Sequence, residues 1–153
     1  MNSLQLHYLT PALISSCVQR ALEEDIGKGD LTGQLLDPKK ITKAVIKATQ
    51  PGILSGQPFV NQVLQSVDSQ IQVKWEYCDG QSFQSGDILA HLQGPAPSLM
   101  TAKRTCLNFL QTLSATATQT RALVDLIAHT QTKILDTRKT LPGLRLAQKY
   151  AVI

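Results

Sequence analysis

The chain is organised around one stretch, which reads Ile134-Leu135-Asp136-Thr137-Arg138-Lys139-Thr140-Leu141-Pro142-Gly143. Its first two residues are apolar and are typical of a buried strand. Its last two residues mark a turn. Between them, within five residues, lie a carboxylate, two hydroxyls and two cations. The pattern predicts a strand that delivers polar side chains at its C-terminal end, which is where α/β folds place their chemistry.

The two cations of this stretch suit an anionic ligand. Arg138 can form two parallel hydrogen bonds with a carboxylate or phosphate, and Lys139 adds a point charge beside it. Two adjacent cations favour a substrate with more than one negative group. The residues alone fit a second interpretation equally well, in which this is a polar strand end whose charges are merely solvated.

The composition describes a globular protein with one domain's worth of core. The chain has 153 residues, of which 42% are hydrophobic and 17% charged, so it is not of the disordered class. The net charge is +4, but aromatic residues make up only 5%, which gives no stacking surface for nucleic acid. We therefore expect no nucleic-acid partner, and an anionic small molecule accounts for the charge equally well.

The cysteines and the apolar runs bear on location. Cys17, Cys78 and Cys106 are widely spaced and odd in number, as expected for reduced thiols in a cytoplasmic protein. We expect no signal peptide, because no basic segment followed by an apolar core opens the chain. No apolar run approaches the roughly 20 residues that span a bilayer, so no membrane association is expected.

Periodicity and turn residues predict an alternation of helices and strands. The Thr10-Pro11 pair is a helix start, with a hydroxyl N-cap and proline at the first helical position. We expect Gly94–Pro97 to end the sheet, since it cannot continue a strand, and Ser98 to cap the next helix. The predicted helices span 11–26, 58–67, 99–128 with a break near 114–116, and 144–152; the predicted strands span 43–49, 53–54, 71–77, 88–92 and 133–136.

Four stretches, in order along the chain, resemble the quinolinate phosphoribosyltransferase family, also called carboxylating nicotinate-nucleotide pyrophosphorylases. The most specific is Asp136–Arg145, followed by Lys149-Tyr150-Ala151-Val152. One such motif would be weak evidence, but four in the right order are specific. The other three stretches are Glu24–Thr32, Gly52–Gly56 and Arg104–Gln111.

The resemblance implies an α+β fold. It places an N-terminal open-faced α/β sandwich over residues 1–97, with part of the following helices packed on it. Residues 98–153 would then hold linking helices and the first strand-helix unit of an α/β barrel, with Lys133–Asp136 as the first barrel strand. Because the family's later motifs are missing after Ile153, we expect a fragment of the enzyme or a truncated derivative, inactive by itself.

The reaction implied by the resemblance joins quinolinate to 5-phosphoribosyl 1-pyrophosphate. The products are nicotinate mononucleotide, pyrophosphate and carbon dioxide, as used in NAD biosynthesis. Both substrates are anionic, so binding them together requires several cations. A magnesium ion is expected with the sugar donor, its protein ligands lying outside this chain.

The resemblance also assigns the binding residues. Thr137, Arg138 and Lys139 match the loop that grips the carboxylates of quinolinate. Arg104 matches an arginine that a homodimer donates into the partner's site, although from the sequence alone it reads as a solvated helix charge. No catalytic residue and no metal ligand is assigned to this chain.

Some features fit the family less directly. Glu24, Asp25 and Asp30 are expected to be structural or interface residues, because acids would be poor ligands for anionic substrates. Lys103 stands where the family has glutamate, which leaves the orientation of Arg104 open, while the cysteine at 106 and the alanine at 115 are small changes. Two alternatives remain: a non-catalytic relative that keeps a dimerisation surface, and a related phosphoribosyltransferase acting on another carboxylated base.

Overall fold

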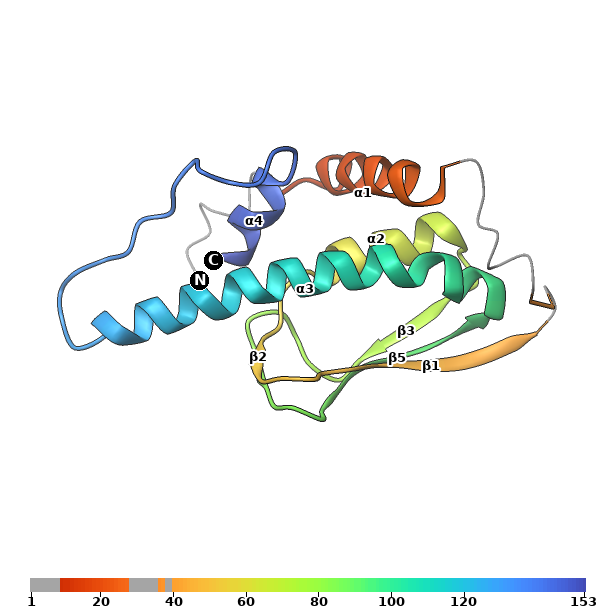
Figure 1. Cartoon of the computed structure of the whole chain (residues 1–153), viewed down its shortest axis with the longest axis horizontal. Coiled ribbons are helices and arrows are strands. Elements are labelled where there is room, and N and C mark those ends of the chain that lie inside the picture. Colours follow the sequence, from red (N-terminus) through yellow and green to blue (C-terminus); the bar gives the residue numbers. More distant parts are fainter. Residues whose placement is uncertain (1–8, 28–35, 38–39) are drawn as a thin grey trace.

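The computed structural model describes residues 9–27, 36–37 and 40–153. These residues form layers, with a sheet on one side, two helices across it and a further helix on top (Figure 1). Most of the predicted turn at Gly27–Thr32, including Asp30, lies outside the described residues. The arrangement confirms the expected α+β class.

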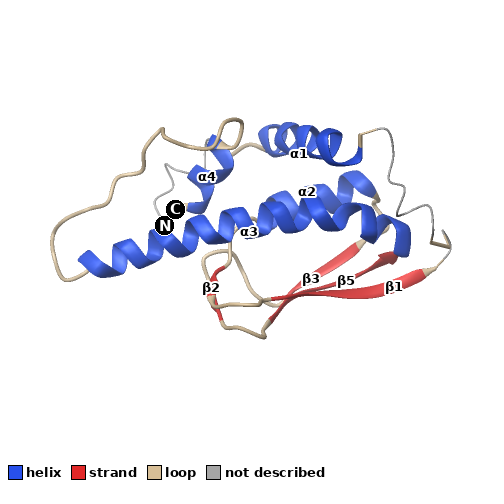
Figure 2. Ribbon diagram, in the orientation of Figure 1, coloured by secondary structure: helices blue, strands red, loops and turns tan. Residues whose placement is uncertain are grey.

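The main sheet has three antiparallel strands in the order β1-β5-β3. They are β1 (Ile41–Lys47), β5 (Ile88–Pro95) and β3 (Gln72–Trp75). A second, two-stranded sheet pairs β2 (Gly52–Ile53) with β4 (Ser82–Phe83). Figure 2 shows the main sheet on one side of the helices, so the described residues cover only one of its faces.

The register explains why this sheet is open on its outer face. Val45, His91 and Lys74 lie opposite one another across the three strands and are all exposed. The next row, which includes the fully buried Ala90, points toward the helices. Alternation of exposed and buried positions is typical of an antiparallel sheet with one solvated face, and the predicted open-faced sandwich is confirmed.

Two helices cover the inner face. α2 (Gln57–Val67) buries four apolar side chains of its stripe, and α3 (Ala96–Ile127) packs along it, with its last turns extending beyond the sheet (Figure 1). The rings of Phe59 and Phe109 stack with their centroids 5.3 Å apart between the two helices. This contact lies in a core that α1 closes from the other side.

Helix α1 (Pro11–Ile26) begins as the sequence predicts. The Thr10 hydroxyl accepts a hydrogen bond from the Leu13 backbone N–H at 3.3 Å, with Pro11 in the first turn. The helix ends at Gly27, whose φ of 52° is a conformation that favours glycine.

The sheet ends within Gly94–Pro97, as predicted, but the predicted strand 88–92 is three residues too short. β5 continues through Gly94 and Pro95, and α3 follows directly at Ala96. Proline is tolerated there because β3 pairs no further than Gln93, so Pro95 has a neighbouring strand on one side only. Ser98 does not cap the helix; its hydroxyl donates to Asp68 Oδ2 at 2.6 Å.

The predicted break near 114–116 is also wrong, because α3 is continuous over 32 residues. The hydroxyls that suggested a break have partners that leave the helix intact. Thr116 donates to the carbonyl of Thr112 at 3.0 Å, four residues earlier. Ser114 is buried; its Oγ accepts the Ser55 backbone N–H at 3.1 Å and donates to the Ser55 carbonyl at 3.2 Å. It therefore docks α3 onto the segment before α2.

Lys133–Asp136 does not form the predicted strand. Its backbone pairs with no strand in the described part of the chain, and Leu135 is 80% exposed. A strand is stabilised by its neighbours, and none lies beside this segment. The predicted last helix is confirmed as α4 (Arg145–Ala151), which buries Ala147 and Ala151. No helix among the described residues combines the length and apolarity needed to cross a membrane.

Candidate functional site

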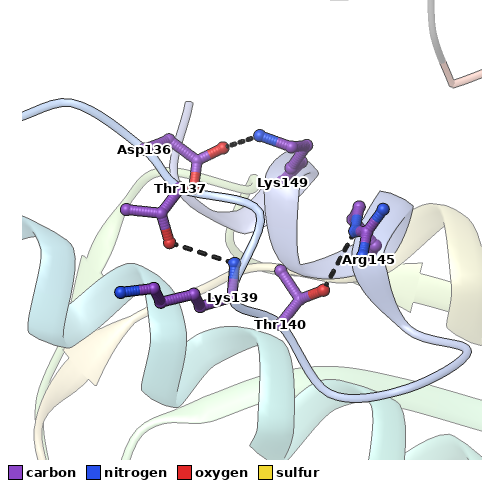
Figure 3. A network of polar contacts seen from close by, with 6 residues as sticks. All are labelled: Asp136, Thr137, Lys139, Thr140, Arg145 and Lys149. Carbon is purple, nitrogen blue, oxygen red and sulfur yellow. Dashed lines mark hydrogen bonds and ion pairs between the residues drawn. The ribbon is translucent and has the colours of Figure 1, made fainter.

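Residues Thr137–Lys139, called here the cationic stretch, lie in the segment that joins α3 to α4, and α4 holds this segment at two points. Lys149 forms an ion pair with Asp136, just before the stretch (Figure 3). Arg145 Nε donates to the Thr140 hydroxyl at 3.3 Å, just after it. Both anchors come from one helix, so Thr137–Lys139 is a short bridge between fixed ends.

Within this bridge the two cations are available. The Thr137 hydroxyl accepts the backbone N–H of Lys139 at 3.2 Å, which turns the chain locally. The side chains of Arg138 and Lys139 are exposed and pair with no other residue that the structure describes. In Figure 3 the Lys139 ammonium points away from Arg145. The bridge therefore presents a guanidinium and an ammonium group that no anion among the described residues neutralises.

Helix α4 is itself fixed to the sandwich through Tyr150. Its hydroxyl donates to Asp79 Oδ2 at 2.7 Å, and its ring meets that of Phe59 edge to face. Asp79 also accepts the backbone N–H groups of Gly56 and Gln57 at 3.0 Å, at the start of α2. Burial and, secondarily, the bond to Asp79 raise the pKa of Tyr150 well above its usual value.

Tyr150 and Asp79 were not identified from the sequence as a linked pair. The residues are 71 positions apart, and Asp79 stands in an Asp-Gly turn where a solvated role is the ordinary expectation. The only available signal was the place of Tyr150 in the Lys149–Val152 motif.

Arg104 lies on α3. Its side chain is 71% exposed, and its Nη1 donates to Asp25 Oδ1 at 3.0 Å. The other oxygen of Asp25 accepts the Thr105 hydroxyl at 3.1 Å. Lys103 is exposed and has no partner among the described residues, so the orientation of Arg104 is set by Asp25 rather than by residue 103.

The structure brings only part of the predicted site together. Thr137, Arg138 and Lys139 are adjacent, but no hydrogen bond or ion pair links them to Arg104 within the described residues. Arg104 instead lines a groove of about 660 Å³ between α1, α3 and Pro142–Leu144. The residues that follow Thr140 therefore reach the Arg104 groove, whereas none of the three predicted binding residues lines it.

The described residues contain no group of three or more His, Cys, Asp or Glu side chains that could hold a metal ion. The three cysteines are unpaired. Burial raises the pKa of Cys106 to about 12, and burial likewise raises the pKa of Cys17, so both are neutral thiols near pH 7. The chemistry that the described residues support is therefore the binding of an anion by Arg138 and Lys139.

Two family models match consecutive parts of the chain. One, described as quinolinate phosphoribosyl transferase, N-terminal domain, matches residues 30–114. The other, described as the C-terminal domain of the same enzyme, matches residues 116–153. Together they cover the cationic stretch and the α3 side of the Arg104 groove, while α1 lies outside both matches.

Individual relatives agree with the family models. A probable carboxylating nicotinate-nucleotide pyrophosphorylase of Bacillus subtilis is 39% identical over 152 residues, which is 99% of this chain and 50% of that protein. A quinolinate phosphoribosyltransferase of Nicotiana glauca is 38% identical over 92% of this chain and 40% of its own length. The chain thus spans about half the length of the curated relatives it matches.

Solved structures show the same fold. The nicotinate-nucleotide pyrophosphorylase of Francisella tularensis superposes with a TM-score of 0.90 at 45% sequence identity, covering 94% of this chain and 52% of that one. The NadC structure from Streptococcus pyogenes gives a TM-score of 0.89 at 35% identity over the same share of each chain. Identity and fold therefore point to one family.

Proposed function

This chain belongs to the quinolinate phosphoribosyltransferase family, and from that premise we propose that it is part of a carboxylating nicotinate-nucleotide pyrophosphorylase. The substrates would be quinolinate and 5-phosphoribosyl 1-pyrophosphate. The ring nitrogen of quinolinate bonds to C1 of the ribose as pyrophosphate leaves. The bond from C2 to its carboxylate then breaks, carbon dioxide departs, and the electron pair left on the ring takes up a proton.

The observation that carries the proposal is the availability of Arg138 and Lys139. The chain holds two cations side by side, exposed and unpaired among the described residues, on a segment anchored at Asp136 and Thr140. Unpaired cations on a fixed backbone suit a rigid dianion, because the ligand's two carboxylates replace lost hydration with charge-assisted hydrogen bonds. Quinolinate has two adjacent carboxylates on a planar ring.

In this proposal the cations bind and orient, and they also stabilise charge. Arg138 forms a forked contact with one carboxylate while Lys139 and the Thr137 hydroxyl contact the other. Once carbon dioxide leaves, the ring carries carbanion character that nearby positive charge stabilises. Magnesium would accompany the pyrophosphate of the sugar donor, and since the described residues offer no ligand group for it, no step here depends on it.

We propose further that the protein is a homodimer in which Arg104 completes the partner's site. Arg104 is exposed, and no hydrogen bond or ion pair joins it to Thr137–Lys139 within the described residues, which supports a role outside its own chain's site. A two-fold dimer would place each copy of this arginine in an equivalent position.

A cytoplasmic location without a nucleic-acid partner completes the proposal. It is supported by three unpaired cysteines, two of them buried or half-buried, and by an aromatic content of only 5%.

The test is a comparison of bases with the protein encoded by the complete gene. It would be incubated with 5-phosphoribosyl 1-pyrophosphate, magnesium and one of two bases, quinolinate or nicotinate, while pyrophosphate release is followed. We expect release with quinolinate only. Release with nicotinate alone would identify a related phosphoribosyltransferase, and no release with either base would identify a non-catalytic relative.

A further inference from the structure

We infer that Asp25 is a positioning residue that presents the Arg104 guanidinium to the substrate's carboxylate, an inference that rests on the proposed function. Two side chains from α3 converge on this one carboxylate at the end of α1: Arg104 Nη1 at 3.0 Å and the Thr105 hydroxyl at 3.1 Å. Each occupies a different oxygen of Asp25, so the carboxylate is held at both ends.

The three side chains differ in burial in a way that suits positioning. Thr105 is 2% exposed, and the Asp25 side chain is 17% exposed, whereas the Arg104 side chain is 71% exposed. All three residues line the groove, but the threonine and the acid are its more buried members and the arginine is the most exposed of the three. The buried Thr105 holds the Asp25 carboxylate, and this carboxylate in turn holds Nη1 of Arg104.

The contact leaves Arg104 able to bind a ligand. Arginine carries five N–H donors, and Asp25 engages only the Nη1 atom. The Nη2 and Nε groups remain for an incoming carboxylate. Because the free side chain of arginine loses much rotational freedom on binding, an arginine already held by Asp25 binds with a smaller entropic cost.

The acidic residues around Asp25 also destabilise the C-terminal end of α1. Glu23, Glu24 and Asp25 stand at the C-terminal end of α1, where negative charge opposes the helix dipole. Glu23 accepts a hydrogen bond from Gln19, one turn earlier, and Glu24 has no partner among the described residues. Of the three acids, Asp25 is the one whose side chain bonds to another helix in the described structure. Its contacts with Arg104 and Thr105 therefore offset the unfavourable interaction of this acid with the helix dipole.

The experiment compares two charge removals at neighbouring positions in the complete gene product. Asp25→Asn keeps the size of the side chain and removes its charge, and Glu24→Gln removes the same charge from the same helix end without touching Arg104. Calorimetry would give the Kd of quinolinate and of 5-phosphoribosyl 1-pyrophosphate, with thermal unfolding measured alongside. The quinolinate Kd is also measured for Asp25→Asn in the Arg104→Ala background.

We expect Asp25→Asn to raise the quinolinate Kd about fivefold to tenfold, given the modest strength of exposed ion pairs and the ordering they provide. The sugar-donor Kd of Asp25→Asn should stay within about twofold of the wild-type value, and its Tm should match that of the wild type. Glu24→Gln should keep both Kd values within about twofold of the wild type, with an unchanged Tm. In the Arg104→Ala background Asp25→Asn should have no further effect, since a residue acting through Arg104 is silent without it. Thr105→Val should raise the quinolinate Kd in the same direction by releasing Asp25, which keeps the test decisive if Asp25→Asn fails to fold.

An unchanged or tighter quinolinate Kd in Asp25→Asn would overturn the inference, as would an equal effect with and without Arg104. Should Asp25→Asn not fold, an unchanged Kd in Thr105→Val has the same meaning. A wild-type protein that binds no quinolinate would overturn the proposed function, and this inference with it.

Discussion

The Tyr150 hydroxyl lies 2.7 Å from Asp79 Oδ2, and this hydrogen bond joins the last helix of the chain to the start of α2. The same helix holds the cationic segment through the ion pair of Lys149 with Asp136. A continuous set of contacts therefore runs from the sandwich, through α4, to Thr137–Lys139. The stability of the sandwich and the geometry of the Thr137–Lys139 segment are linked through Tyr150.

Tyr150→Phe tests this link. The ring contact with Phe59 remains, but Asp79 loses one of its donors, so we expect the free energy of unfolding to fall by about 1 kcal/mol. Tyr77→Phe is the matched control, because it removes a tyrosine–aspartate bond of the same 2.7 Å length that does not involve α4. Denaturant unfolding reports both losses. Only Tyr150→Phe should also weaken quinolinate binding; equal binding in the two variants would show that α4 does not need this anchor.

The bond from Ser98 to Asp68 predicts a pH-dependent contribution to stability. The Ser98 hydroxyl, and secondarily the Gln70 N–H, lowers the pKa of Asp68 below its ordinary 3.8. A lowered folded pKa gives stability that is present above the unfolded pKa and is lost as pH falls through the folded value. The Tm difference between wild type and Ser98→Ala should thus be constant above about pH 5 and shrink as pH falls below 4.

Ser85→Ala is the control for this measurement, because its hydroxyl donates to the carbonyl of Thr49, a group that does not titrate. Its Tm difference from wild type should not depend on pH. A Ser98→Ala difference that grows on acidification would contradict the assigned direction of the Asp68 pKa shift.

Sequence patterns correctly predicted the elements whose formation depends on residues nearby in the sequence. Thr10 and Pro11 start α1 because capping is decided within one turn, and the apolar stripe of α2 packs as its spacing indicates. The failures depend on distant partners. Ser114 suggested a break until Ser55, 59 positions away, proved to be its partner, and Lys133–Asp136 has strand character without a neighbouring strand.

In the candidate site, too, the features set by local sequence could be predicted and the contacts between distant residues could not. The availability of Arg138 and Lys139 follows from a short motif and could be predicted. The contact of Arg104 with Asp25 spans 79 positions, and that of Tyr150 with Asp79 spans 71, so neither could be read from local spacing. Opposition of three acids to the α1 dipole was the one local indication that Asp25 has a partner.

Arg138→Ala, made in the complete gene product, should weaken quinolinate binding far more than sugar-donor binding. Loss of a desolvated, charge-assisted contact is expected to cost on the order of 2–5 kcal/mol. Lys133→Ala is the control, because it removes one exposed positive charge from the same segment without a proposed contact. Calorimetry gives both constants. Equal losses for the two substrates would mean that Arg138 does not bind the carboxylates of quinolinate.

Subunit mixing tests whether Arg104 acts in the partner's site. Arg104→Ala and Arg138→Ala should each lose most activity alone. In a hybrid dimer one site has Arg104 from the Arg138 variant and its own Arg138, so it is intact, while the other site carries both defects. With random exchange half the dimers are hybrids, and about a quarter of wild-type activity should return.

Exchange itself would be followed with differently tagged subunits. If hybrids form and activity stays at the level of the separate variants, Arg104 acts within its own subunit or not at all.

The most direct measurement follows the fate of the C2 carboxylate. Quinolinate labelled in that carboxylate is incubated with the complete gene product, magnesium and 5-phosphoribosyl 1-pyrophosphate, and labelled carbon dioxide and nicotinate mononucleotide are counted together. The account predicts equal amounts of both, neither formed without the sugar donor, and a large loss of both in Arg138→Ala. Nucleotide that retains the label, or the absence of both products from the wild-type protein, would contradict it.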